Sequence, residues 1–212
     1  LRGMLQRYEF HGLLRNLPQQ AQDGGPPDAA LASASDDRLA GARYRTLRSR
    51  AEIAEAVAAC RAAGRLAFDT ETTSLVQSRC QLVGLSLAWR HGEAAYIPIG
   101  HRGEGLGVQP AQQEVLDLLR PLLEDPAFPK VGQNTKFDLQ VLAGCGLDVR
   151  GIAGDPMIAS YLLDPDTPGN HNLDSLASHY LRHRMIPFAE VTGADKAEDA
   201  FAGVPVEQAT QY

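Results

Sequence analysis

An apolar stretch that ends in two carboxylates constrains the fold of this chain more than any other feature of its sequence. Leu66-Ala67-Phe68 has the composition of a buried β-strand, and Asp69-Thr70-Glu71 follows it directly. Side chains alternate along a strand, so Asp69 and Glu71 point to the same face. Two like charges this close destabilise each other unless a cation lies between them, and oxygen ligands suit a hard ion such as Mg²⁺ or Mn²⁺. We therefore expect a β-sheet that carries a metal-dependent active site.

The composition is ordinary for a soluble globular protein. With 212 residues, 44% of them hydrophobic and 22% charged, the chain can form one sizeable domain plus some additional material. No apolar run approaches the roughly 20 residues of a membrane helix, and no signal peptide precedes the domain. Three widely spaced cysteines, Cys60, Cys80 and Cys145, argue for a reducing compartment. We expect a cytoplasmic monomer without membrane association.

The charge is distributed unevenly along the chain. The formal net charge is −6, yet residues 1–50 carry 8 Lys and Arg against 5 Asp and Glu, and residues 51–212 carry 12 against 21. An acidic domain can still bind a polyanion if metal ions on its carboxylates reverse the local field. Weak, local binding to DNA is then expected, without a broad basic patch.

The sequence divides into three parts. Residues 1–17 have helical periodicity. Residues 18–42 have the composition of a flexible linker and include the strong breaker Gly24-Gly25-Pro26-Pro27. Residues 43–212 form the expected folded domain.

The pattern of elements within the domain predicts an α/β fold. Strands are expected at residues 65–70, 81–89, 94–99 and 130–132, and helices at 51–63, 110–123, 134–143, 157–163, 173–181 and 205–212. Three strands come first and strands then alternate with helices, which is typical of a mixed sheet flanked by helices. Asp155 and Asp174 are expected to cap helices.

A second motif supplies another carboxylate. In Gly132-Gln133-Asn134-Thr135-Lys136-Phe137-Asp138, Asn134 lies where a strand gives way to a helix and Asp138 lies one turn into that helix. Asp138 can face the mouth of the sheet and complete a two-metal site with Asp69 and Glu71. Taken alone, the pattern is equally consistent with helix capping.

The two motifs together resemble those of a known enzyme family. Residues 68–72 and 131–138 are similar to the first two motifs of the DEDD exonuclease superfamily. Four other segments resemble the 3′-5′ exonuclease (proofreading) domains of bacterial DNA polymerase I, a tyrosine-type branch; these are Leu82-Val83-Gly84-Leu85-Ser86, Ala95-Tyr96-Ile97-Pro98, residues 155–163 and residues 173–177. The resemblance covers residues 44–212, and Arg7-Tyr8-Glu9-Phe10 is similar to the tail of the 5′-nuclease region of the same polymerases.

This resemblance implies a ribonuclease H-like fold and a role in DNA replication and repair. The expected reaction is two-metal-ion hydrolysis of 3′-terminal nucleotides from single-stranded or frayed DNA. The parent protein would be a bacterial, nucleoid-associated DNA-directed DNA polymerase, with polymerase and 5′-nuclease domains on the same chain.

The resemblance also assigns roles to individual residues. Asp69, Glu71 and Asp138 would bind two divalent ions, Mg²⁺ or alternatively Mn²⁺ or Zn²⁺. The positions expected to bind substrate are Thr72 and Leu75 at the terminal nucleotide, and Gln133, Asn134 and Phe137 along the path of the strand, where an aromatic ring can stack on a base.

The third motif of the tyrosine branch is Tyr-x-x-x-Asp. Tyr212 matches its tyrosine, which positions the attacking water, and the aspartate four residues later would fall beyond residue 212. Without that ligand, we expect these 212 residues to be inactive or very slow alone although the parent protein is active.

Two alternatives remain open. One is an RNA exonuclease of the ribonuclease D kind, which shares the four-acid chemistry. The other is a catalytically silent scaffold that keeps the exonuclease fold. Retention of Asp69, Glu71 and Asp138 argues against a silent scaffold.

Overall fold

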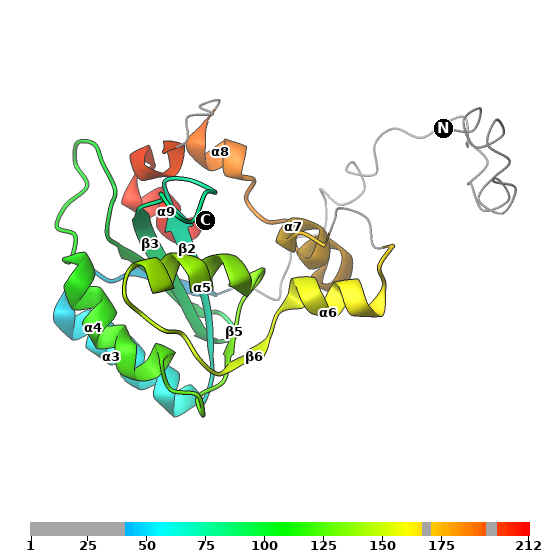
Figure 1. The fold of residues 1–212 in the computed structure, drawn as a ribbon. Coiled ribbons are helices and arrows are strands. Elements are labelled where there is room, and N and C mark those ends of the chain that lie inside the picture. The colour runs from blue at the N-terminus through cyan, green and yellow to red at the C-terminus, as the bar shows by residue number, and fades with distance from the viewer. Residues whose placement is uncertain (1–40, 167–170, 194–198) are drawn as a thin grey trace, which may run out of the picture. The chain divides into compact units, whose positions relative to one another are not determined.

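The computed structural model describes residues 41–166, 171–193 and 199–212, and its centre is a six-stranded mixed sheet (Figure 1). The predicted helix at 1–17 and most of the linker at 18–42 therefore lie outside the described residues. The strand order is β1-β4-β3-β2-β5-β6. The strands are β1 (Arg43–Thr46), β2 (Leu66–Thr72), β3 (Leu82–Arg90), β4 (Glu93–Pro98), β5 (Lys130–Val131) and β6 (Ile152–Gly154).

The first three predicted strands form an antiparallel meander, and the outer strands are parallel to their neighbours. β2 pairs with β3 and β3 with β4 in antiparallel register. β1 runs parallel to β4, and β5 and β6 continue the sheet in parallel beyond β2. This arrangement agrees with the expected mixed sheet.

Helices cover both faces of the sheet. The longer ones are α3 (Arg50–Ala63), α4 (Gln112–Leu123), α5 (Thr135–Gly144) and α6 (Pro156–Leu163). The shorter segments are α7 (Leu173–Leu176), the π-helical turn η3 (Ala177–Leu181), α8 (Phe188–Thr192), the 3₁₀ turn η4 (Ala200–Gly203) and α9 (Val206–Gln211). Figure 1 shows α3 and α4 side by side, and α9 contacts β1 and β4. Among the described residues, no helix has the length and apolar composition needed to cross a membrane.

Alternation along the strands sorts the side chains into two clusters. On one face, Phe68 of β2 packs with residues of α3, α4 and α5 in the larger core. On the other face, Tyr96 of β4 packs with residues of α8, η4 and α9. The register places Asp69 opposite Ser86 and Ser86 opposite Tyr96, so Asp69 and Glu71 lie on the face that α9 covers.

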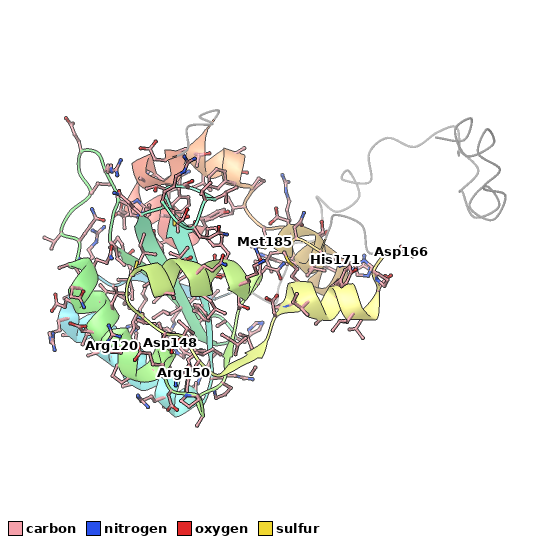
Figure 2. All side chains as sticks on the ribbon, in the orientation of Figure 1. Arg120, Asp148, Arg150, Asp166, His171 and Met185 are labelled. Atoms are coloured by element: carbon pink, nitrogen blue, oxygen red, sulfur yellow. The ribbon has the colours of Figure 1, made fainter. Side chains whose placement is uncertain are left out.

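An ion-pair network ties α4 to the loop that follows α5. Arg120 donates to Glu124 (Nη1–Oε1, 2.6 Å) and to the carbonyl of Gly146 (3.0 Å). Asp148 accepts from Arg150 (2.6 Å) and donates its backbone N–H to Glu124 (3.1 Å). Figure 2 labels Arg120, Asp148 and Arg150 at this end of the domain. These partly exposed hydrogen bonds join α4 to the residues that follow α5, at the edge of the larger core.

Local signals account for several helix boundaries. Ser49 accepts from the N–H of Glu52 while Glu52 accepts from the N–H of Ser49, a capping box that begins α3. Gly64 adopts a left-handed conformation (φ 70°) and ends that helix.

Several elements differ from the sequence prediction, which also lacks α8. β1 and β6 are edge strands, and the alternating arginines of Arg43-Tyr44-Arg45 concealed the first of them. The single helix predicted at residues 173–181 is instead α7 followed by the π-helical turn η3. Asp174 does not cap a helix, and the prediction is corrected: Asn172 is the N-cap of α7, because its side chain accepts from Ser175 N–H at 2.8 Å.

Candidate active site

Three carboxylates meet beside the carboxyl-terminal end of β2. Asp69 and Glu71 extend from one face of β2, and Asp138 extends from the first turn of α5. Asp138 is almost fully buried, with 1% of its surface exposed, whereas Asp69 is exposed and Glu71 is half-buried. The structure therefore brings together the three acids that the sequence separates by up to 69 residues.

A short neighbouring strand creates the position that Asp138 occupies. β5 pairs with β2 only at Leu66 and Ala67, so the N–H of Thr70 has no strand partner on that side. Asp138 Oδ1 accepts from Thr70 N–H at 3.0 Å and from Thr70 Oγ1 at 2.6 Å. A buried N–H must find an acceptor, and Asp138 provides it while its second oxygen, Oδ2, stays outside these two bonds.

The close approach of α5 to β2 depends on Gly132. A Cβ at this position would lie 2.8 Å from Thr135 Cγ2 and 2.9 Å from the carbonyl oxygen of Phe68. No side chain fits between the strand and the start of the helix, so glycine allows Asp138 to reach Thr70.

One aspartate caps two helices next to the site. Asp155 Oδ2 accepts from Thr135 N–H (2.8 Å) and Thr135 Oγ1 (3.0 Å), and its Oδ1 accepts from Asn134 N–H (3.0 Å) and Met157 N–H (3.0 Å). Burial tends to raise its pKa, but these hydrogen bonds outweigh burial and lower the pKa below its ordinary value. The predicted cap of α6 is confirmed, and the same carboxylate also holds the start of α5.

Burial and neighbouring negative charges raise the pKa of each of the three acids. Burial, and then the charges of Asp69 and Asp138, raise the pKa of Glu71 to about 8. Although the residue keeps an exposed surface, the protein atoms around the Asp69 carboxylate partly desolvate it, and this desolvation and the charge of Asp138 raise its pKa to about 7. Burial raises the pKa of Asp138 to about 6, and the bonds from Thr70 limit that rise. Strongly perturbed carboxyl groups on one surface are typical of a functional site.

Tyr212 lies within electrostatic range of these acids. Burial raises its pKa above the ordinary value of 10.0, and the charges of Glu71, Asp174 and Asp69 raise it further. Its ring packs against Phe201, with centroids 5.5 Å apart. The phenol therefore stays neutral and can donate a hydrogen bond near the carboxylates. Sequence reasoning missed the influence of Asp174 on this group, because residues 174 and 212 are far apart in the sequence.

Hydrogen bonds from β1 and the segment after it hold α9, the helix that ends beside Tyr212. Thr46 and Thr210 share a hydrogen bond of 2.7 Å between their hydroxyls. Arg48 donates to Glu207 at 2.8 Å and to the carbonyl of Leu106 at 2.6 Å. Arg48 therefore connects α9 to the segment that contains Leu106.

A buried histidine, His101, connects Tyr96 of β4 to the carbonyl of Val204 through two hydrogen bonds. His101 Nδ1 lies 2.8 Å from the carbonyl of Val204, and its Nε2 lies 2.7 Å from the hydroxyl of Tyr96. A carbonyl can only accept, so Nδ1 carries the proton, and Nε2 of the neutral ring accepts from Tyr96. The Tyr96 hydroxyl occupies the space of an absent side chain, since a Cβ on Gly84 would lie 1.9 Å from it.

The other residues predicted to bind substrate differ in their exposure and hydrogen bonds. Thr72 donates its hydroxyl to the carbonyl of Ser74 (2.9 Å), and Leu75 is 86% exposed on the following loop. Asn134 is exposed at the start of α5 in a left-handed conformation (φ 54°). Phe137 is half-buried and packs against the larger core. Of these, Leu75 presents the largest free apolar surface.

Gln133 keeps one polar atom open. Its Nε2 donates to the carbonyl of His171 at 2.8 Å, and His171, labelled in Figure 2, bonds through Nδ1 to the hydroxyl of Ser160 at 2.9 Å. Gln133 Oε1 is the only buried side-chain N or O atom in the described part of the chain that has no hydrogen-bond partner. An unsatisfied buried acceptor is costly and commonly marks a place that a ligand completes.

The donor set suits a hard divalent cation, although it is not a preformed cage. All three acids offer oxygen, and a cation between them would relieve the repulsion that raises their pKa values. Within residues 41–166, 171–193 and 199–212, no group of three or more His, Cys, Asp or Glu side chains is arranged to hold one ion by itself. An ion here would use pairs of these carboxylates and take its other ligands from water or substrate.

Comparisons with known proteins identify the family. Residues 44–212 match the family model described as "3'-5' exonuclease". The chain belongs to the 3′-5′ exonuclease family. DNA polymerase I of Pseudomonas aeruginosa is 44% identical over 149 residues, which cover 69% of this chain and 16% of that protein. DNA polymerase I of Rhizobium leguminosarum is 38% identical over 186 residues, 80% of this chain and 18% of that protein. The exonuclease chain thus spans less than a fifth of the length of these relatives.

Solved structures agree with this family and with the fold. A structure described as the apo form of a nuclease has a TM-score of 0.52 and 26% identity, covering 79% of this chain and 77% of its own. The catalytic core of RRP6 from Trypanosoma brucei has a TM-score of 0.55 at 14% identity, covering 88% and 52%. The exonuclease fold is therefore the expected ribonuclease H-like mixed sheet flanked by helices.

The metal-free protein is expected to lose stability as the pH rises from about 5 to about 8. The raised pKa values of Asp69, Glu71 and Asp138 mean that the folded state binds more protons than the unfolded state across this window. Stability must therefore fall with increasing pH, because the unfolded carboxyl groups ionise near pH 4. The measurement is the urea midpoint at each pH in the presence of EDTA.

Added Mg²⁺ should restore the midpoint at pH 8 more than at pH 5, since the ion binds ionised carboxylates. Asp138→Asn provides the control, because it removes one of the interacting charges and should flatten the pH dependence. A slope that is identical in the wild type and this variant would contradict the assignment of the effect to the three acids.

Proposed function

We propose that the chain is the proofreading domain of a bacterial DNA polymerase I and hydrolyses 3′-terminal nucleotides of single-stranded or frayed DNA. The observation that carries the proposal is the meeting of Asp69, Glu71 and Asp138 beside Tyr212. Because the chain belongs to the 3′-5′ exonuclease family, we assign the hydrolytic centre to these residues.

The residues of the site have separate roles in the proposed reaction. Asp69, Glu71 and Asp138 would hold two divalent ions, Mg²⁺ or alternatively Mn²⁺ or Zn²⁺, which when bound supply a water of lowered pKa and positive charge for the phosphate. Tyr212, kept neutral by its surroundings, positions the attacking water with its hydroxyl. Thr70 keeps Asp138 in place through two hydrogen bonds.

Residues at the rim would bind the end of the DNA strand. Leu75, exposed on the loop after β2, wedges against the terminal base, and Thr72 ends β2 just before that loop. Gln133 offers its open acceptor Oε1 to a hydroxyl of the sugar, while Asn134 and Phe137 line the path of the strand. Single-stranded DNA is favoured as substrate because its terminal bases are free to be wedged apart.

The relatives also suggest the setting of the domain. Both are named DNA polymerase I and are several times longer than this chain. We infer a monomeric bacterial protein of the cytoplasm, associated with the nucleoid, in which polymerase and 5′-nuclease domains accompany this one during DNA replication and repair.

The experiment is Mg²⁺-dependent shortening of a 5′-labelled single-stranded DNA oligonucleotide, with protein in excess so that slow cleavage is visible. The 212-residue chain is compared with a form that continues past Tyr212, because the third motif calls for an aspartate four residues further on. Stepwise loss from the 3′ end by the longer form is the expected result. A matched RNA oligonucleotide that is degraded faster than the DNA would favour a ribonuclease D-like activity instead.

A silent scaffold predicts a different outcome. No shortening of either nucleic acid, together with no Mg²⁺ binding in titration calorimetry of the longer form, would overturn the proposed hydrolysis. Binding of Mg²⁺ without cleavage would instead indicate that the longer form lacks a residue needed for cleavage, or that neither oligonucleotide is its substrate.

A further inference from the structure

The hydroxyl of Tyr96 takes the place of a side chain opposite Glu71. Gly84 is the direct partner of Glu71 in the antiparallel pair of β2 and β3, and a Cβ on Gly84 would overlap the Tyr96 hydroxyl. Cβ atoms of directly opposite residues lie about 4.5–5.5 Å apart, so this hydroxyl is within reach of the Glu71 carboxylate. Burial raises the pKa of Tyr96 and the charge of Glu71 raises it further, which agrees with this placement and keeps the phenol protonated.

The proton of the Tyr96 hydroxyl is directed to His101. The carbonyl of Val204, 2.8 Å from His101 Nδ1, can only accept, so Nδ1 carries a proton. Burial is the largest influence on the pKa of His101 and lowers it, so the ring is neutral and Nε2 has a lone pair. The Tyr96 hydroxyl, 2.7 Å from Nε2, must then donate to it. A hydroxyl has one proton, and Tyr96 therefore has none for Glu71.

The surrounding contacts fix the orientation of His101. Its backbone N–H donates to Gln109 Oε1 at 2.9 Å, and its carbonyl accepts from Gln109 Nε2 at 3.0 Å. The ring is buried and lies 6.0 Å from the ring of Phe201 between centroids. A half-turn about the Cβ–Cγ bond would place C–H groups where the two nitrogens now lie, so only the present orientation satisfies both partners.

Without the acceptor on His101, the Tyr96 proton would need another partner. A buried hydroxyl that makes no hydrogen bond costs free energy. The Glu71 carboxylate is an acceptor within reach, and a hydrogen bond to a charged oxygen is stronger than one to a neutral acceptor. Such a bond would occupy an oxygen that a cation bound at the acids requires.

We propose that His101 is a positioning residue of the metal site: by accepting the proton of Tyr96, it keeps that hydroxyl from competing with a divalent cation for Glu71. The inference rests on the proposed function in that it takes Glu71 as a metal ligand. It adds a residue that contacts neither the ion nor the DNA and acts through the direction of one hydrogen bond.

The first test determines the tautomer of His101 in the metal-free 212-residue chain. In protein labelled with ¹⁵N, the nitrogen shifts of an imidazole distinguish a protonated ring nitrogen from an unprotonated one, and His101→Phe identifies the signals of this ring. We expect a protonated Nδ1 and an unprotonated Nε2. A protonated Nε2 would overturn the proposal, because Tyr96 would then accept from His101 and its own proton would be free for Glu71.

The second test measures the Mg²⁺ affinity of the same chain from the amide shifts of β2 during titration. His101→Phe should weaken Mg²⁺ binding about tenfold, since a hydrogen bond to the carboxylate must be broken first. The double variant Tyr96→Phe/His101→Phe should bind Mg²⁺ near the parent value, because the competing hydroxyl is gone. Both variants lose the bond to Val204, so recovery in the double variant separates competition at Glu71 from a general loosening of the fold.

Two further variants complete the comparison. His101→Gln keeps an amide oxygen that can accept from Tyr96 and should retain most of the affinity. His91→Phe makes the same ring exchange at an exposed residue in the turn between β3 and β4 and should leave the affinity unchanged. Thermal melting identifies any variant whose folding is impaired.

Two results of the titration would overturn the proposal. One is an unchanged Mg²⁺ affinity in His101→Phe, and the other is a double variant that binds Mg²⁺ no better than His101→Phe. Neither test reads cleavage. The role of His101 can therefore fail while the proposed hydrolysis stands, and a longer form that binds Mg²⁺ without cleaving DNA would leave the role of His101 supported.

Discussion

Replacing Asp138 by asparagine is expected to reduce cleavage of the DNA 3′ end by about 10²–10³-fold and to make the metal-free protein more stable at pH 8. Loss of one charged metal ligand removes several kcal/mol of transition-state stabilisation, and each 1.36 kcal/mol is a factor of ten in rate. The same change removes a charge that raises the pKa of both Asp69 and Glu71. Single-turnover cleavage rates and urea midpoints in EDTA measure the two effects.

Asparagine is chosen because its amide oxygen can still accept from Thr70 N–H and Thr70 Oγ1. The control is Asp117→Asn on α4, an exposed aspartate outside the site, which should change neither quantity. A variant that loses both activity and stability would indicate that Asp138 is mainly a structural acceptor, and would count against its role as a metal ligand.

Replacing Asp155 by alanine is expected to destabilise the domain by about 3 kcal/mol. The carboxylate accepts four hydrogen bonds from the starts of α5 and α6. A single capping side chain contributes about 1 kcal/mol, and this one serves two helices with a charged acceptor. For a domain of this size, 1 kcal/mol corresponds to about 2–4 °C in Tm, so thermal melting should show a fall of roughly 6–12 °C.

Activity should fall as well, since α5 carries Asp138 and begins at the residues that Asp155 caps. Asp155→Asn should lose less activity and less stability than Asp155→Ala, because its amide keeps one acceptor oxygen. Asn172→Ala, which removes the single capping bond of α7, provides the comparison and should cost about 1 kcal/mol. An Asp155→Ala variant as stable as Asn172→Ala would show that the bonds to α5 contribute little.

Much of the sheet could be predicted because strands and helices leave local patterns. The run of β-branched and apolar residues in β3, and the capping box of Ser49 and Glu52, depend only on near neighbours in sequence. β1 and β6 could not be predicted from the same signals. They are short edge strands with few buried side chains, and their pairing is decided by what lies next to them in space.

The same distinction applies to the individual site residues. Asp69 and Glu71 share a face because the side-chain period of a strand is two, which their spacing alone determines. The sequence could not show that Asp138 meets Thr70, that Asp155 caps α5, or that Arg102 and Asp199 lie together. Each of these contacts joins segments that only the completed fold brings together.

The sequence by itself determined the identities of the acids, the strand that presents two of them and the helix that carries the third. The tertiary structure alone decided how far they approach, how much water they lose and which hydrogen bonds restrain them. The physical reason is that backbone geometry is local, whereas burial and the pKa shifts of Asp69, Glu71 and Asp138 arise from packing between distant segments.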